Sequence, residues 1–289
     1  MNRFLKTISL SCCALLVGLS ACRNHELTSV SPLGPGAPSG TLQPAGDDLI
    51  VGVSKKHTLV KHGNTSLIYN PDGTLQKVTT GNRVTTYSYG PGKISFLTTE
   101  NGKKTDDGNF YLDANGRCLQ SDANTYYVQD GINFIQINPL KYEYDGSGRL
   151  SKRYSTIYQQ QRIEFFYDAN GDLAETKEYG FSNTLIQRNT YFYATERGAA
   201  LISDRHSLNP VGIRDMDPYL RVFGKRSKHL VHRLKIEQPV YDGVNTDHRY
   251  KYTLDGDGFV IQRNKTVTAN GLLLESVPYE YLITDIPIN

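Results

Sequence analysis

Acidic residues recur at turn-like positions in this 289-residue chain, and their spacing suggests calcium binding first. A calcium loop needs oxygen ligands at alternating positions and a bidentate carboxylate at its end. In "TLDGDGFV", Asp255 and Asp257 fit the alternation, but Thr253 and Asn264 stand where further carboxylates are needed. The related stretch "DANGDL" at 168–173 lacks the glycine that such a loop requires. We therefore interpret both as hairpin turns and predict no metal site.

The histidines do not have the spacing of a zinc site. His229 and His232 are three residues apart in a stretch that reads as a strand, so they point to opposite faces. We expect the other internal histidines to be solvated or to serve as capping residues. These are His57, His62, His206 and His248.

The sequence contains no recognisable motif for nucleophilic catalysis or for cofactor binding. The chain has no G-x-S-x-G elbow, no G-x-G-x-x-G opening a helix and no phosphate-binding loop. Cys118 stands beside a predicted turn without a recognisable base. We therefore expect no cofactor and no catalytic residue.

A pair of carboxylates from different strands could still converge, as in glycoside hydrolysis. The alternative function is thus an envelope hydrolase directed at glycans, with acids drawn from Asp113, Asp145 and Asp168. Each of these acids follows an aromatic pair and is expected in a turn that faces solvent. We consequently predict that the protein is not an enzyme.

Beyond residue 50, the dominant pattern is an alternation of aromatic and polar positions. "HRYKYTL" and "LKYEYD" are examples, and such alternation indicates half-buried antiparallel strands. The chain has 20 Tyr, 10 Phe and no Trp, so these rings either fill the core of a sheet or line a concave face that stacks on sugars or peptides. The candidate ligand-binding residues are Tyr142, Tyr144, Tyr250 and Tyr252.

A glycine follows most of the aromatic strands, in the pattern aromatic, Asp, one or two small residues, Gly and aliphatic. Asp-Gly and Asn-Gly supply the positive φ angle of a tight hairpin turn. The pattern predicts an all-β fold, an antiparallel hairpin meander that curves into a barrel-like sheet. The turn glycines are Gly73, Gly116, Gly148, Gly171 and Gly258, with weaker copies at Gly92 and Gly198.

One segment interrupts the alternation, between residues 209 and 228. Asp217 and Pro218 can begin a helix as N-cap and first residue, and Gly224 can end it. We expect one short inserted helix that covers a sheet face or the mouth of a barrel.

A barrel that spans the membrane is disfavoured by the residues opposite the tyrosines. Lipid-facing positions should be uncharged over about 9–11 residues of each strand. That face instead carries Lys141, Glu143, Arg249 and Lys251.

The N-terminus predicts export. Residues 1–21 have two basic residues and then an apolar run too short to remain as a spanning helix, as in a signal peptide. "LSAC" resembles the lipobox of bacterial lipoproteins, which implies cleavage before Cys22 and acylation of its sulfur. Residues 22–48 are rich in Pro, Gly and Ser and should form a flexible tether.

Charge and cysteine content limit the partners. Loss of residues 1–21 removes two positive charges, so the formal charge falls from +3 to about +1, which gives no electrostatic basis for nucleic-acid binding. Cys118 is the one cysteine left in the expected domain, residues 49–289, so that domain must rely on its core.

The motif Y-x-Y-D-x-x-G-R-L is similar to the YD repeats of Rhs-type proteins. Together with the lipobox and the tether, the array resembles bacterial lipoproteins that carry a domain of unknown function with a porin-like fold. Residues 218–236 resemble a segment of that family as well. The resemblance implies a curved or closed antiparallel sheet and no particular activity.

The expected function is that of a non-catalytic binding or scaffold module of the cell envelope. Acyl chains on Cys22 would anchor it to the bacterial outer membrane, on the periplasmic or the surface face. Its expected partners are the membrane and a glycan, a peptide or an envelope protein.

Overall fold

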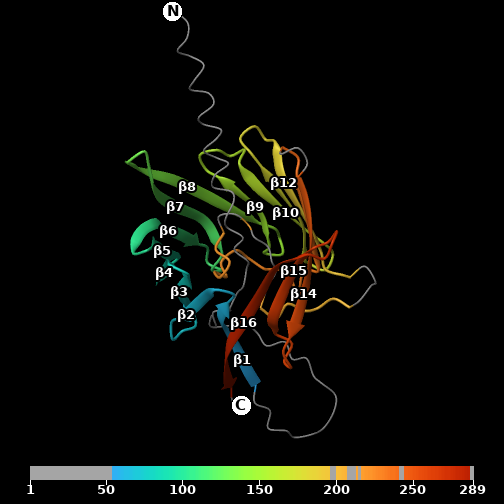
Figure 1. Ribbon diagram of the computed structural model, residues 1–289. Helices are drawn as coiled ribbons and strands as arrows, with labels where there is room; N and C mark the ends of the chain where they lie inside the picture. Colours follow the sequence, from blue (N-terminus) through green and yellow to red (C-terminus); the bar gives the residue numbers. More distant parts are fainter. Residues whose placement is uncertain (1–53, 196–199, 207–212, 214–215, 241–243, 287–289) are drawn as a thin grey trace, which may run out of the picture.

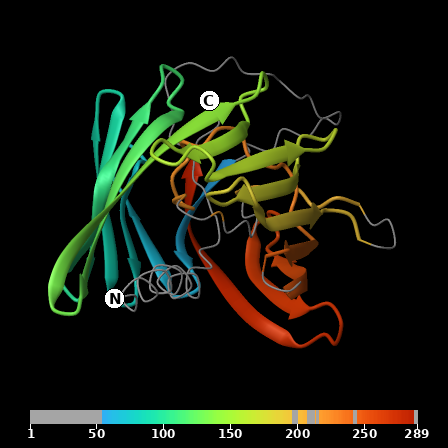
Figure 2. The same cartoon turned by 90° about the horizontal axis from the view of Figure 1, so that it is seen from above.

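Sixteen antiparallel strands close into one barrel in the computed structural model (Figures 1 and 2). The structure describes residues 54–195, 200–206, 213, 216–240 and 244–286. The strands are β1 (Ser54–His62), β2 (Thr65–Tyr69), β3 (Leu75–Thr80), β4 (Arg83–Gly90), β5 (Lys93–Glu100), β6 (Lys103–Leu112), β7 (Cys118–Gln129), β8 (Ile132–Tyr144), β9 (Leu150–Ser155), β10 (Arg162–Tyr167), β11 (Leu173–Tyr179), β12 (Leu185–Phe192), β13 (Arg233–Gln238), β14 (Val244–Leu254), β15 (Val260–Val267) and β16 (Leu273–Ile286).

Each strand pairs with its neighbours in the sequence, and β1 closes the barrel against β16. This closing pair runs from Ser54 opposite Ile286 to His62 opposite Tyr279. The barrel thereby has no free edge along its wall, which removes the usual liability of an open sheet. The predicted antiparallel meander that forms a barrel is confirmed.

The alternation of the sequence separates the inside of the wall from the outside. Tyr142 and Tyr250 point inward and are buried, whereas Lys141 and Lys251, which are their neighbours in the sequence, are exposed. Neighbouring strands form ion pairs across the outer face: Lys61–Glu280, Lys152–Glu143, Arg188–Glu175, Arg188–Glu237 and Arg233–Asp247.

The repeated motif marks every second turn, so its copies gather at one end of the barrel, which we call the motif end. In the copy between β8 and β9, Asp145 N–H donates to the Arg149 carbonyl at 2.8 Å, and Gly148 N–H donates to the Asp145 carbonyl at 2.9 Å. Gly148 has φ of 79°, as expected for such a turn. The turn glycines with positive φ are Gly73, Gly92, Gly116, Gly148, Gly171 and Gly258, whereas Gly198 lies outside the described residues.

The predicted helix at Asp217–Gly224 is wrong, because this segment is irregular throughout. Its helix-start signal is real but serves a local turn: the Asp217 carboxylate accepts the Tyr219 N–H at 2.8 Å. Gly224 does have positive φ, yet it is needed because a Cβ there would lie 2.7 Å from the Gly148 carbonyl oxygen. The Val222 carbonyl bonds to the barrel, and the carbonyls of Pro218 and Leu220 accept hydrogen bonds from the Arg226 side chain. No helix in the described residues could span a membrane.

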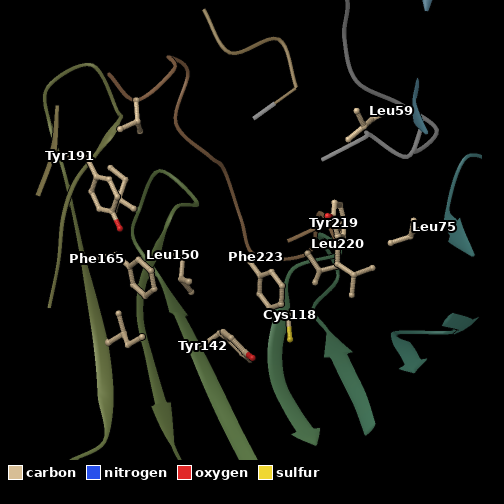
Figure 3. Packing of buried hydrophobic residues seen from close by; sticks show 14 of the residues in the cluster. Leu59, Leu75, Cys118, Tyr142, Leu150, Phe165, Tyr191, Tyr219, Leu220 and Phe223 are labelled. Atoms are coloured by element: carbon tan, nitrogen blue, oxygen red, sulfur yellow. The ribbon is translucent and has the colours of Figure 1, made fainter. Parts of the chain in front are cut away.

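Residues 216–232 therefore form what we call the plug, an extended segment inside the motif end. Cys118 N–H donates to the Val222 carbonyl at 2.7 Å, and Lys225 N–H donates to the Gly148 carbonyl at 2.9 Å. Figure 3 shows Phe223 of the plug near Cys118 and Tyr142 of the wall. The buried apolar residues of the plug are Tyr219, Leu220, Val222, Phe223, Leu230 and Val231.

Candidate functional site

The motif end concentrates the tyrosines of the repeat, and their hydroxyl groups bond to the backbone of the adjacent strand. Tyr167 Oη donates to the Leu150 carbonyl at 2.9 Å, across the β9–β10 hairpin. The same bond to an adjacent strand occurs five times, from Tyr89 to Leu75, Tyr144 to Cys118, Tyr167 to Leu150, Tyr193 to Leu173 and Tyr281 to Val260. Tyr252 makes the corresponding bond to the carbonyl of Val231 in the plug.

A β-bulge beside these turns explains why the carbonyls need a partner. The ladder shifts register where Tyr144 comes opposite Leu150 and where Tyr167 comes opposite Leu173. A bulge leaves a backbone group outside the regular ladder. The inward tyrosine supplies a hydroxyl at that place, which gives the second tyrosine of the Y-x-Y motif a structural role.

Arginines of the motif stack on the same rings. The Arg117 guanidinium lies 4.8 Å from the ring centroid of Tyr144, and that of Arg149 lies 4.6 Å from that of Tyr167. Each arginine also binds the aspartate of its own turn, since Arg149 Nε donates to Asp145 at 2.7 Å. The motif residues Tyr, Asp and Arg therefore form one structural unit.

The three acids considered for hydrolysis are each occupied by their own turn. Asp113 accepts the N–H groups of Asn115 and Arg117, both at 2.8 Å. Asp145 and Asp168 accept the equivalent groups of their turns. Burial alone would raise the pKa of Asp113 and of Asp145, but hydrogen bonds from the turn outweigh it and lower both pKa values. This geometry suits turn formation, and the lowered pKa values keep Asp113 and Asp145 deprotonated near neutral pH.

Of the four candidate ligand-binding tyrosines, Tyr142 and Tyr250 lie in the core, and Tyr144 and Tyr252 are partly buried against it. Tyr142 and Tyr250 are 3% and 2% exposed, and the Tyr142 hydroxyl lies 3.0 Å from Ser121 Oγ. Tyr144 donates to the Cys118 carbonyl, and Tyr252 donates to that of Val231 at 2.8 Å. Burial raises the pKa of Tyr144, Tyr250 and Tyr252. As placed, the rings are packed within the chain, and their binding role stays a prediction.

Asp172 is the residue that sequence reasoning missed, because it was considered only as a calcium ligand. It is fully buried and accepts the backbone N–H of Lys228 at 2.6 Å and that of His229 at 3.1 Å. His229 Nδ1 lies 2.6 Å from its other oxygen. One signal was present: Asp172 stands where two other motif copies have an arginine, Arg117 and Arg149. An acid at this position bonds the plug instead of its own turn.

Ser227 adds a second attachment beside it. Leu173 N–H donates to Ser227 Oγ at 2.9 Å, and the Tyr193 hydroxyl lies 3.0 Å from the same oxygen. The side chain of Arg226 donates to the carbonyls of Pro218 and Leu220 within the plug. Burial lowers the pKa of Arg226 to about 10, so the guanidinium remains charged at neutral pH. These contacts attach the plug to Leu173 and Tyr193 of the wall and link separate parts of the plug to each other.

The expectation of solvated histidines is wrong for the four scattered ones, which are 5–9% exposed. His57 stacks on Phe259 with ring centroids 3.8 Å apart, and His62 stacks on Tyr279 at 4.7 Å. His206 packs against Tyr281 at 5.1 Å. The flat imidazole rings pack against these aromatic side chains. The residues involved are far apart in the sequence, so the alternation pattern could not predict this packing.

The described residues contain no group of three or more His, Cys, Asp or Glu that could hold a metal ion. Asp255, one of the two acids of the calcium hypothesis, accepts the N–H groups of Asp257 and Phe259 in its own turn. Cys118 is buried, and burial raises the pKa of its thiol to about 12. A thiol with so high a pKa is a poor nucleophile at neutral pH.

The predicted signal peptide, Cys22 and the predicted tether lie outside the described residues. No family model matches the chain, and no curated protein matches it. A solved structure described as a porin-like protein from Bacteroides vulgatus is similar, with a TM-score of 0.52, 15% identity, and 75% of this chain and 92% of that chain covered. That likeness shows the fold.

Two further solved structures match with lower TM-scores. A porin-like protein from Bacteroides uniformis has a TM-score of 0.31, 14% identity, and 70% of this chain and 97% of that chain covered. The Tc holotoxin pore of Photorhabdus luminescens has a TM-score of 0.21, 12% identity, and 75% of this chain but 15% of that chain covered.

Proposed function

We propose that this chain is a non-catalytic barrel protein of the bacterial cell envelope that acts as a binding or scaffold module. The observation that carries the proposal is the plug: the chain's own residues pack the motif end, and their polar groups bond to its turns. The acids most suited to hydrolysis form hydrogen bonds within their own turns. Turn and tyrosine groups that bond within the chain suit a protein that presents a surface.

The proposed location is the outer membrane, through acyl chains on Cys22. The sequence "LSAC" after the apolar run supports it, and so does the similarity to a porin-like protein from a Bacteroides species. Each buried CH₂ of an acyl chain contributes about 0.8 kcal/mol to membrane binding. Outward charges such as Lys177 and Glu175 favour a barrel that stands beside the bilayer.

Labelling tests the anchor. Cells that express the chain are grown with radiolabelled palmitate, and the protein is then partitioned between detergent and water. We expect label in the wild type and none in Cys22→Ser, which should accumulate as an uncleaved precursor. Absence of label from the wild type would overturn the anchor.

A ligand panel tests the role. The mature protein is screened against glycans, peptidoglycan fragments and peptides, and products are followed by mass spectrometry. Binding without turnover supports a binding module. Product that disappears in Asp113→Asn, Asp145→Asn or Asp168→Asn would establish the envelope hydrolase in its place.

A further inference from the structure

The hairpin formed by β7 and β8 extends beyond the wall of the barrel (Figures 1 and 2). β6 pairs with β7 only as far as Asp106 opposite Thr125, and β9 pairs with β8 only from Ser155 opposite Leu140. The pairing of β7 with β8 continues without a register shift to Gln129 opposite Ile132. Among the described residues, no strand covers either side of this extension.

The direction of the free backbone groups follows from one hydrogen bond. The Pro139 carbonyl accepts the Thr156 N–H at 3.0 Å, so Pro139 faces the β9 side of β8. In an antiparallel strand, the N–H and C=O of one residue point to the same side, and alternate residues share that side. Asn133, Ile135 and Ile137 therefore direct three N–H and three C=O groups to the free side.

The same three residues lie in an exposed and nearly uncharged stretch. Ile135 and Ile137 are 61% and 60% exposed, and Asn133 is exposed beside them. On the opposite face of the hairpin, Tyr127 and Phe134 stack with ring centroids 5.5 Å apart, each about two fifths exposed. From Thr125 to Leu140, the one charged residue is Asp130 at the tip. An apolar strand edge without charges is a template for strand pairing.

We propose that this edge pairs with the same edge of a second copy of the chain, antiparallel and about a two-fold axis at Ile135. Ile135 then faces Ile135 of the second copy, and Asn133 faces Ile137 of the second copy. This register forms six hydrogen bonds, and it spans residues 132–138, which end just before β9 occupies the edge at Leu140. A two-fold axis requires a self-complementary edge. This edge is self-complementary, because the pairing of Asn133 with Ile137 occurs on both sides of Ile135.

Charge favours a second copy over a lipid surface. In the proposed register, the two Asp130 side chains lie at opposite ends of the paired segment, so they do not repel each other. Insertion of the tip into a membrane would instead place Asp130 deepest and leave the strand edge unpaired in hydrocarbon. The inference does not depend on the proposed binding role or on the acyl anchor.

The experiment combines sedimentation with cross-linking and uses the complete mature protein in detergent. We expect a dimer for the wild type. Ile135→Lys should raise its dissociation constant at least about tenfold, because two ammonium groups would face each other across the axis. Ile68→Lys is the matched control, since Ile68 is an exposed wall residue at 42%, and it should leave the dimer intact.

Cross-linking tests the register. A short bismaleimide should join Ile135→Cys to itself, and it should join Asn133→Cys to Ile137→Cys in a mixture more efficiently than either to itself. The buried Cys118 gives little background. A wild type that sediments as a monomer, a dimer that survives Ile135→Lys, or cross-links without this preference would each overturn the proposal.

Discussion

At the scale of the residue, the repeat is explained by the positions of its hydrogen-bonding atoms. The aspartate accepts the backbone N–H groups of its turn, and the glycine adopts positive φ. The second tyrosine reaches the carbonyl at a bulge, as Tyr167 does at Leu150. Because each of these motif residues has a hydrogen-bond or conformational role inside the chain, the role that the structure supports for the motif is to shape the turns.

Tyr167→Phe tests the tyrosine bond. The change keeps the ring but leaves the Leu150 carbonyl without its donor, so the free energy of unfolding should fall by about 1–2 kcal/mol in urea titrations. Tyr158→Phe is the control, because Tyr158 is 50% exposed, and it should change the free energy little. Equal effects of the two changes would contradict the role of the hydroxyl.

Gly171→Val tests the turn. Gly171 has φ of 87°, which a β-branched residue adopts only with strain, so we expect a loss of more than about 1 kcal/mol in the free energy of unfolding. Gly146 belongs to the equivalent turn between β8 and β9, but it lacks positive φ and a Cβ there would meet open space. Gly146→Val should therefore be much milder, and the reverse order would refute the assignment.

At the scale of the element, the plug replaces the helix that its sequence signals suggested. Asp217 accepts a backbone N–H and Gly224 adopts positive φ, as the predicted helix ends would require. In the structure, however, both residues shape turns of a segment that is not helical. Asp172 links that segment to the β10–β11 turn through two backbone N–H groups and His229. A buried carboxylate with three donors is a strong attachment point.

Asp172→Asn should loosen the plug without opening the wall. The amide brings N–H groups toward donors, so we expect a loss of about 2–3 kcal/mol in the free energy of unfolding. Hydrogen exchange followed by mass spectrometry should accelerate in residues 216–232 more than in β4 and β5. Uniform acceleration along the chain would show that Asp172 does not hold the plug specifically. Asp285→Asn, at an exposed strand position, is the control.

The acidic turns should also make the protein sensitive to acid. Hydrogen bonds lower the pKa of Asp113 and Asp145 relative to the unfolded chain. A carboxylate with a lowered pKa stabilises the fold above its unfolded pKa of about 4, and that contribution is lost as pH falls through the folded pKa. The melting temperature should therefore fall below about pH 4. Asp145→Asn should flatten this fall, and an unchanged slope would contradict it.

At the scale of the whole molecule, the barrel shares its fold with a porin-like protein but carries charges on its outer face. Arg188 lies between Glu175 and Glu237, and Arg233 binds Asp247, all across neighbouring strands. A basic residue on the lipid face costs about 2–4 kcal/mol at the midplane of a bilayer. Such a wall is suited to water.

The mature protein should therefore give no ion conductance in planar bilayers. A porin of known conductance serves as the positive control for the bilayer. Stepwise channels that persist at high dilution would mean that the charged wall does face lipid, and the proposed placement beside the membrane would then be wrong.

The sequence by itself determined the strands, the motif turns and the antiparallel order, because these depend on contacts between near neighbours. The alternation around Tyr250 and the glycine at 171 each report a local preference of the backbone. Only the tertiary structure decided the closure of β1 on β16 and the path of the plug, since both depend on residues that are far apart in the chain. The helix failed for this reason: strong local signals at Asp217 and Gly224 were outweighed by partners on distant strands.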